Sequence, residues 1–108
     1  MEALTRVIDA NWLSARLMWS LQTFGAGQRT NGIVEHIKRE LDEVLDADGK
    51  ALLEWVDVIL LAFDGAARAG FSGQDIIEGL YEKMKINEAR KWPKISGEDT
   101  PTFHIKED

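Results

Sequence analysis

Cysteine is absent from this chain of 108 residues, and it has only two histidines. Without cysteine the protein can form no disulfide, no thiolate nucleophile and no cysteine-ligated zinc or iron–sulfur site. His36 and His104 are too few for a histidine-rich metal site, and neither follows a glutamate at the Glu-x-x-His spacing of ferritin-like di-iron bundles. The G-x-S-x-G motif of serine hydrolases is also missing.

Long hydrophobic runs are missing as well. No stretch approaches the roughly 18 apolar residues of a membrane helix, and the first six residues lack the basic start and apolar run of a signal peptide. Apolar residues make up 44% of the chain and charged residues 30%, which suits a single globular domain. We therefore expect a cytoplasmic protein without a membrane partner.

The net charge of −6 argues against a general affinity for nucleic acid polymers. Residues 35–64 contain nine acidic and three basic residues and so account for the whole excess. Residues 83–94 have the opposite balance, with five basic residues against one acidic residue. An acidic centre and a basic segment together would suit a cation bound with a polyanionic small molecule.

Apolar residues recur at helical spacing along most of the chain. They predict an all-α, four-helix fold, with helices over residues 4–21, 31–45, 51–69 and 73–91. The first helix should be amphipathic with a broad apolar face, whose stripe is Leu4, Val7, Ile8, Trp12, Ala15 and Met18, with Leu17 and Leu21 beside it.

The third helix is apolar over more than half its circumference, so we expect it to be central and the most buried. Ser72 and Asp75 have capping-box spacing before the fourth helix, and Gly49 is a plausible stop for the second. We predict a domain over residues 1–93 and an irregular C-terminal tail over 94–108.

Residues 24–32 include three glycines and should form a loop between the first two helices. Glycine can bring backbone N–H groups close to a ligand, but no predicted strand precedes this loop, so the Rossmann and Walker patterns are excluded. From the residues alone, a plain connecting loop and a ligand-contacting loop are both open.

The central pattern is Glu40-x-x-Glu43 followed by Glu54-x-x-Asp57. Residues three apart lie on one face of a helix, so two carboxylates from each of two antiparallel helices should converge. They would repel one another unless a divalent cation lay among them, and oxygen ligands alone favour Mg²⁺ or Mn²⁺. A solvated polar face is the alternative that spacing leaves open.

The apolar stripe of the fourth helix continues at helical spacing into Lys83, Asn87 and Arg90. These side chains could contact a polyanion, or they could simply extend into solvent near a helix end. Together with the carboxylates they suggest metal-dependent attack on the phosphate chain of a nucleotide.

Four further blocks, residues 23–32, 36–41, 53–61 and 87–93, complete a resemblance. With the two carboxylate motifs, they resemble the MazG-like all-α nucleoside triphosphate pyrophosphohydrolases, and within them the dATP/dGTP diphosphohydrolase subgroup that includes phage MazZ enzymes. The resemblance covers roughly residues 20–93. Two departures are Arg39, where the superfamily often has a second glutamate, and a gap of ten residues between the motifs.

The resemblance implies an oligomeric four-helix enzyme, a homodimer or homotetramer in a bacterial or phage-infected cytoplasm. It would hydrolyse a purine deoxynucleoside triphosphate, dGTP and/or dATP, to the monophosphate and pyrophosphate. The resemblance makes Glu40, Glu43, Glu54 and Asp57 the catalytic and Mg²⁺- or Mn²⁺-binding residues, and Lys83, Asn87 and Arg90 the phosphate-binding residues.

Three residues remain possible nucleotide contacts. Arg29 belongs to the glycine-rich loop, and His36 lies one turn before Glu40, where it could support that carboxylate or simply face solvent. Trp19, like Trp12, could stack on a base, although tryptophan at helical spacing is more often part of a core. A non-catalytic helical module that binds nucleotide or a partner helix through its acidic groove is the alternative function.

Overall fold

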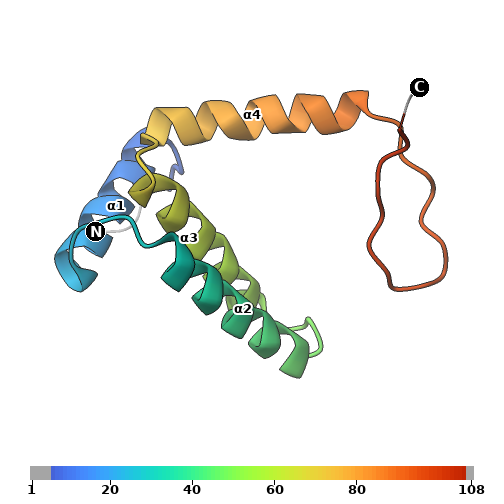
Figure 1. The fold of residues 1–108 in the computed structure, drawn as a ribbon, viewed down its shortest axis with the longest axis horizontal. Helices are drawn as coiled ribbons and strands as arrows, with labels where there is room; N and C mark the ends of the chain where they lie inside the picture. The colour runs from blue at the N-terminus through green and yellow to red at the C-terminus, as the bar shows by residue number, and fades with distance from the viewer. Residues whose placement is uncertain (1–5, 107–108) are drawn as a thin grey trace. The chain divides into compact units, whose positions relative to one another are not determined.

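The computed structural model describes residues 6–106 and contains four helices (Figure 1). They are α1 (Ala10–Phe24), α2 (Thr30–Asp46), α3 (Leu52–Arg68) and α4 (Gly73–Ala89). Within the described residues there is no strand, only an isolated antiparallel bridge between Lys91 and Ile105. The predicted all-α, four-helix fold is confirmed. No helix in this part of the chain is long and apolar enough to cross a membrane.

The chain divides into two compact units, Met1–Ile77 and Glu78–Asp108, which we describe separately. The first unit contains α1, α2, α3 and the first turn of α4. In it, α3 packs against both α1 and α2, so the prediction that α3 is central is confirmed.

Helix α1 begins later than predicted, because Asp9 caps it. The Asp9 carboxylate accepts a hydrogen bond from the backbone N–H of Trp12 at 2.9 Å, as an N-cap residue does. Residues 6–9 are not helical, and the predicted residues 4 and 5 lie outside the described part of the chain. The helix ends at Gly25, whose N–H donates to Leu21 O and whose φ is 96°.

The predicted apolar face of α1 is only partly buried: Trp12, Leu17 and Leu21 are half-buried. The buried residues of this helix are Leu13 and Ser20, whereas Met18 is 55% exposed and Val7 and Ile8 are exposed before the helix begins. The helix is therefore rotated relative to its apolar stripe. Ser20 faces inward because it accepts hydrogen bonds from Arg68 of α3, a long-range contact that periodicity does not reveal.

A short turn connects α2 to α3. Asp48 and Gly49 have φ values of 56° and 69°, and Gly49 N–H donates to Val44 O at 2.9 Å; Gly49 thus ends α2 as predicted. Trp55 Nε1 donates to Gly49 O at 3.0 Å and ties the start of α3 to the turn. The two helices consequently run antiparallel, side by side (Figure 1).

The start of α4 is fixed by the predicted capping box. Ser72 N–H donates to Asp75 Oδ2 at 2.9 Å, and Asp75 N–H donates to Ser72 Oγ at 3.0 Å. Gly73 packs so tightly on α1 that a Cβ atom at this position would overlap the carbonyl group of Ala10. Only glycine fits here.

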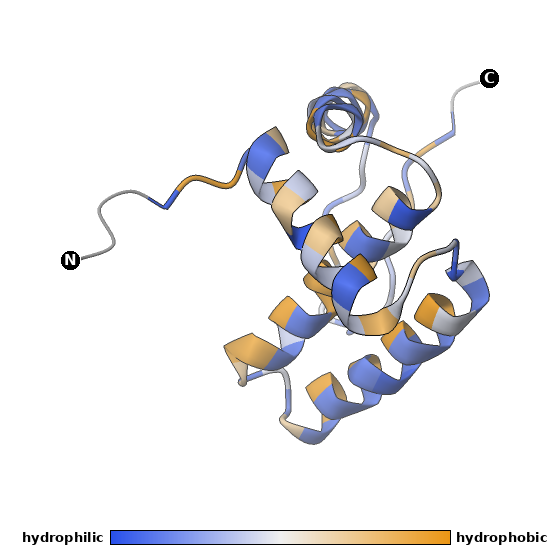
Figure 2. Cartoon of the chain, turned by 90° about the vertical axis from the view of Figure 1, so that its left-hand side faces the viewer, coloured by the Kyte–Doolittle hydropathy of each residue, from blue (hydrophilic) through white to orange (hydrophobic). Residues whose placement is uncertain are grey.

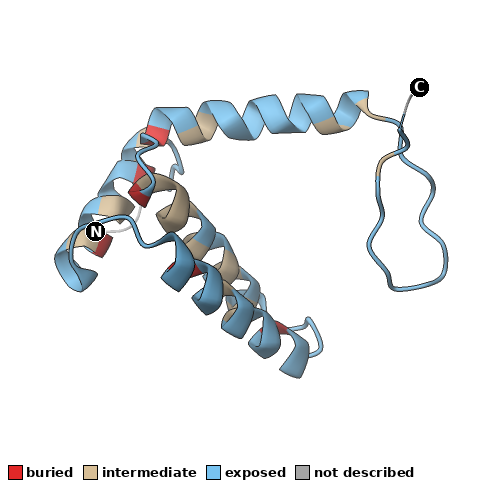
Figure 3. Ribbon diagram, in the orientation of Figure 1, coloured by how far each residue is buried: buried red, intermediate tan, exposed pale blue. Residues whose placement is uncertain are grey.

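The core of the described residues is small. Its buried apolar residues are Leu13, Ile33 and Val44, and most of each helix is exposed or half-buried (Figure 3). Helix α3 is the most buried helix, as predicted: eleven of its seventeen residues are buried or half-buried, a larger share than in the other helices, although the fully buried one is Arg68. Apolar and polar residues alternate along the helices (Figure 2), and Leu45, Leu52 and Leu53 are more than 70% exposed.

The second unit contains the rest of α4 and the segment that follows it. Residues 93–104 form neither helix nor strand. The segment returns to the end of α4, where Ile105 N–H donates to Lys91 O at 2.7 Å. Trp92 packs edge-on against His104 and donates from Nε1 to Asn87 O.

Candidate functional site

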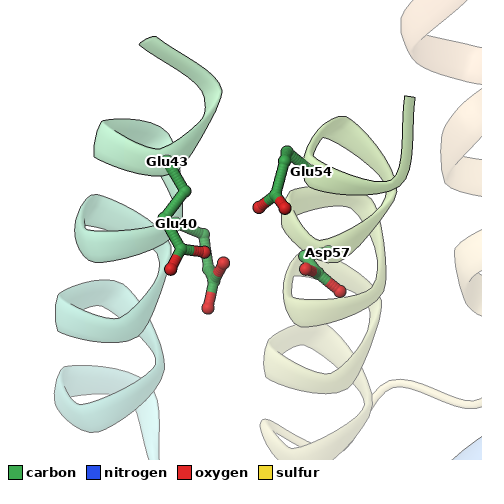
Figure 4. Close-up of side chains that lie close together, drawn as sticks. All are labelled: Glu40, Glu43, Glu54 and Asp57. Atoms are coloured by element: carbon green, nitrogen blue, oxygen red, sulfur yellow. The ribbon is translucent and has the colours of Figure 1, made fainter. Parts of the chain in front are cut away.

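Four carboxylates converge between α2 and α3. Glu40 and Glu43 project from α2 toward Glu54 and Asp57 of α3 (Figure 4). One oxygen from each of the four groups lies within 4.8 Å of the others. The i, i+3 spacing on each helix and the short α2–α3 turn produce this arrangement. The structure thus brings together all four residues that the sequence singled out.

Among residues 6–106, no lysine or arginine pairs with this cluster, and its basic neighbour is His36. Glu40 Oε2 and Glu54 Oε2 are buried and have no hydrogen-bond partner among the described residues. The adjacent Glu43 carboxylate, burial and the charge of Asp57 raise the pKa of Glu40. Burial is the first cause that raises the pKa of Glu54, and the nearby Glu43 and Asp57 carboxylates raise it further. Crowding of like charges and burial thus disfavour the ionised forms.

A divalent cation fits this donor set. Four carboxylates in reach of one point supply only oxygen ligands, which suit hard ions such as Mg²⁺ or Mn²⁺. The two orphaned buried oxygens are the kind of group that a cation would satisfy. Glu40 and Glu54 are half-buried whereas Glu43 and Asp57 are exposed, so the cluster is open to solvent on one side.

His36 contacts the cluster from α2. Its Nε2 lies 3.1 Å from Glu40 Oε1, one helical turn away. This contact lowers the pKa of Glu40 and so partly opposes the effect of Glu43. His36 therefore orients Glu40, as a residue behind a metal ligand would, and also lines the neighbouring cavity.

A cavity of about 460 Å³ opens beside the cluster, within the range of about 300–1,000 Å³ for small-molecule sites. Glu40 and Asp57 form part of its wall, as do Arg29, His36 and Trp19, the three possible nucleotide contacts. The remaining wall comes mostly from α1 and α3 and is rich in apolar and aromatic residues: Trp12, Leu17, Phe24, Leu60, Leu61 and Phe63.

The aromatic side chains of the cavity are held by contacts with one another. Trp12 packs edge-on against Phe63 with ring centroids 6.3 Å apart, and Trp19 packs in the same way against Phe24 at 5.6 Å. The guanidinium of Arg16 lies 4.6 Å from the centroid of Trp19. Such a wall suits a flat aromatic ligand.

Arg68 is the residue that sequence reasoning missed. Its side chain is only 1% exposed, and its guanidinium donates five hydrogen bonds. Nε donates to Asp64 Oδ2 at 3.0 Å, and Nη1 donates to the carbonyls of Gly25 and Gly27, both at 2.9 Å. Nη2 donates to Ser20 O at 3.2 Å and to Ser20 Oγ at 2.9 Å. The only local signal was the i, i+4 spacing from Asp64.

Arg68 also explains the glycine-rich loop. Gly25 and Gly27 have positive φ values of 96° and 115°, which glycine adopts without steric cost. These conformations accompany the hydrogen bonds from their carbonyl oxygens to Arg68. The carbonyl groups of the loop thus anchor the connection between α1 and α2 to Arg68. Arg29, which follows the two glycines, lines the cavity.

The residues expected to bind phosphate, Lys83, Asn87 and Arg90, lie in the second unit. Arg90 Nη1 donates to Asn87 Oδ1 at 3.4 Å. Arg90 also lines a second concavity of about 410 Å³ with Lys91, His104 and Lys106. Phosphate binding by these three residues stays a prediction.

The fold and the site define an all-α protein with a carboxylate cluster beside a cavity of about 460 Å³. The dATP/dGTP pyrophosphohydrolase family matches residues 12–108, and this chain belongs to that family. The predicted resemblance is confirmed.

Two phage proteins are similar to this chain. The dATP/dGTP diphosphohydrolase of cyanophage S-2L is 30% identical over 100 residues, covering 84% of this chain and 92% of the cyanophage protein. The Eaa protein of Salmonella phage P22 is 39% identical over 61 residues, or 56% of this chain, but this chain spans only 19% of its length. No solved structure matches the chain.

Proposed function

We propose that this protein is a metal-dependent pyrophosphohydrolase of purine deoxynucleoside triphosphates, dGTP and/or dATP. Family membership supports the reaction class. The observation that carries the metal dependence is the convergence of Glu40, Glu43, Glu54 and Asp57, with two orphaned buried oxygens, at the wall of a cavity lined by aromatic residues.

The proposed reaction is hydrolysis at the α-phosphorus. The oxygen of a water molecule forms a bond to this phosphorus, and the bond from the phosphorus to the oxygen that bridges to the β-phosphate breaks. Pyrophosphate leaves with that oxygen and its electron pair, and the proton of the water passes to solvent. The products are the deoxynucleoside monophosphate and pyrophosphate.

Glu40, Glu43, Glu54 and Asp57 would hold Mg²⁺ or Mn²⁺. When bound, such an ion lowers the pKa of a water molecule and neutralises charge on phosphoryl oxygens. The chain itself would orient the substrate: His36 positions Glu40 through their 3.1 Å contact, and Arg29 offers a positive charge on the cavity wall. Lys83, Asn87 and Arg90 would hold phosphate oxygens.

We further propose that the active form is a homodimer or homotetramer in the cytoplasm. The apolar side chains of Leu45, Leu52 and Leu53 around the α2–α3 turn are 75%, 72% and 74% exposed. Large exposed apolar patches commonly mark interfaces, and a second copy of the chain would cover this one. Light scattering should give a mass above 12.2 kDa; a fully active monomer would contradict this proposal.

Incubation of the purified protein with each deoxynucleoside triphosphate and Mg²⁺ or Mn²⁺ tests the function. Chromatography should show a monophosphate and pyrophosphate from dGTP or dATP, and no product when a chelator is present. The release of single phosphate ions would indicate a different bond cleavage. Metal binding without turnover of any nucleotide would instead favour a non-catalytic nucleotide-binding module.

A further inference from the structure

One carboxylate of the cavity, Asp64, does not belong to the cluster of four. Asp64 follows Asp57 and Leu61 on one face of α3, and all three line the cavity. Seven residues of α-helix separate Asp64 from Asp57, which is about 10 Å along the helix axis. Asp64 is therefore placed well beyond the cluster, further along the same cavity.

The contacts of Asp64 leave one of its oxygens available. Oδ2 accepts a hydrogen bond from Arg68 Nε at 3.0 Å, the one side-chain hydrogen bond of Asp64 among residues 6–106. Oδ1 is thus left for a ligand or water, and the side chain is 23% exposed. Around it the cavity wall is largely apolar, with Leu60, Leu61 and Phe63 from the same helix. A half-buried acceptor in such surroundings gains from a donor on a ligand.

Arg68 cannot bind the ligand itself. A guanidinium has five N–H donors, and all five of them are used by Asp64, Gly25, Gly27 and Ser20. Arg68 therefore acts as a positioning residue that fixes Asp64 from one side. Within this ion pair, the atom left for a ligand is Asp64 Oδ1.

We propose that Asp64 recognises the base of the substrate and selects guanine. This inference rests on the proposed function. An ionised carboxylate only accepts hydrogen bonds, and guanine presents two adjacent donors, N1–H and the 2-amino group. Adenine presents an N1 acceptor beside its 6-amino group, so its N1 lone pair would face the carboxylate. These groups lie on the Watson–Crick edge of the base. Enzymes that hold a base in a protein pocket recognise it by hydrogen bonds to that edge.

The position of Asp64 suits the base rather than the sugar. The cluster would hold the phosphates, and Asp64 lies about 10 Å further along α3. This distance is longer than the distance from an α-phosphate to the 3′-hydroxyl of the same nucleotide. It fits the reach to the far edge of a purine. Trp12 and Trp19 lie on the wall of this cavity, where their ring faces can contact the flat base.

The test compares substrates in the wild-type protein and in Asp64→Asn. With Asn Oδ1 toward Arg68, the amide nitrogen would face the ligand and donate where the carboxylate accepted. We expect kcat/KM for dGTP to fall roughly 10- to 100-fold, since the hydrogen bonds from guanine to a charged oxygen are lost. The value for dATP should stay within about threefold or rise, because adenine N1 accepts from the new donor.

Ser20→Ala is the matched control. It removes the Oγ acceptor of Arg68 but leaves the Asp64 carboxylate unchanged, so it should alter kcat/KM for dGTP and dATP by the same factor. Melting temperatures of both variants show whether they fold. If Asp64→Asn lowers both substrates equally, Asp64 is structural and the inference is wrong.

A second measurement needs no variant. Deoxyinosine triphosphate keeps N1–H but lacks the 2-amino group, so the wild-type protein should use it roughly fivefold to tenfold less well than dGTP. Equal use of the two would overturn the inference while leaving the proposed function intact. If the wild-type protein hydrolyses no nucleotide, the proposed function fails. Calorimetric binding of dGTP and dATP with Mg²⁺ then decides base selection, and equal affinities would overturn it.

Discussion

The two charged groups on α3 differ in how their charge is balanced. Near the start of the helix, Glu54 and Asp57 meet two more carboxylates, and two buried oxygens there have no hydrogen-bond partner among the described residues. Near its end, Asp64 pairs with Arg68, whose five donors are all used. The first group has little counter-charge, while the second is balanced apart from a single acceptor.

This difference suggests that the carboxylate cluster is the site of the chemistry and that the Asp64–Arg68 pair supports the surrounding structure. A cluster that lacks counter-charge costs free energy in the folded protein unless it binds something, which is typical of sites kept for function. A buried ion pair with satisfied hydrogen bonds fixes geometry. The Arg68 network joins α1, the glycine-rich loop and α3, and these three segments line the cavity that the carboxylates adjoin.

The largest expected effect is on the unbalanced group. Asp57→Asn removes one ligand charge with little change in volume, and we expect turnover to fall at least about 1,000-fold, as when transition-state charge stabilisation is lost. The fold should persist, because repulsion within the cluster decreases. Hydrolysis rates and calorimetric metal titration measure the two effects.

Asp42→Asn is the control for this variant. It makes the same chemical change at an exposed carboxylate of α2 that is outside the cluster, and it should leave turnover close to wild type. Near-normal activity of Asp57→Asn would show that Asp57 is not a catalytic ligand.

The next effect is on the balanced group and concerns stability. Arg68→Met leaves Asp64 and the loop carbonyls without donors, and removal of one partner from a buried ion pair costs about 3–5 kcal/mol. Urea denaturation measures the free energy of unfolding. Arg39→Met, at an exposed arginine of α2, should change it by no more than about 0.5 kcal/mol. Equal small effects would mean that the Arg68 network does not stabilise the fold.

The two groups also differ in how far the sequence predicted them. The four carboxylates were predicted to converge because the cause is local: i, i+3 spacing on each helix and a turn at Gly49 that is short enough to keep the helices antiparallel. Their spacing also suggested a divalent cation among them, and the family resemblance implied that all four would be its ligands. Orphaned oxygens and a shared cavity required the structure.

The Arg68 network escaped prediction because most of its contacts are long-range. Gly25 and Ser20 lie 43 and 48 residues before Arg68 in the chain, and nothing in the local pattern pairs them. The same contacts account for the partial burial of the apolar face of α1, where Ser20 and Leu13 are the buried residues. Local sequence patterns predicted that α1 forms. Which face of α1 points inward depends on its contacts with the buried Arg68.

Without metal, the unbalanced group should make stability depend on pH. Contact with Glu43 and burial raise the pKa values of Glu40 and Glu54 above 4.5. At these two groups the folded protein holds protons more tightly than the unfolded chain. Their contribution to stability is therefore fully present below pH 4.5 and is lost as pH rises through the raised pKa values.

Mg²⁺ should reverse this trend, because it competes with protons for the same oxygens and stabilises the folded protein more as pH rises. Melting temperatures between pH 4 and pH 8, with a chelator or with Mg²⁺, measure both effects. A chelated protein whose melting temperature is independent of pH would contradict the prediction. Asp57→Asn should show a smaller pH dependence, since one of the repelling charges is gone.

The smallest expected effect is Ser20→Ala. The variant removes the Oγ acceptor of Arg68 Nη2, but Ser20 O still accepts from the same nitrogen at 3.2 Å, so the loss should be about 1–2 kcal/mol. Ser14→Ala, at an exposed position of the same helix, should change stability by less than about 0.5 kcal/mol. If Ser20→Ala loses about 1–2 kcal/mol and Arg68→Met about 3–5 kcal/mol, the five hydrogen bonds share the stabilisation. A loss in Ser20→Ala as large as that in Arg68→Met would show instead that the network fails as a unit when one acceptor is removed.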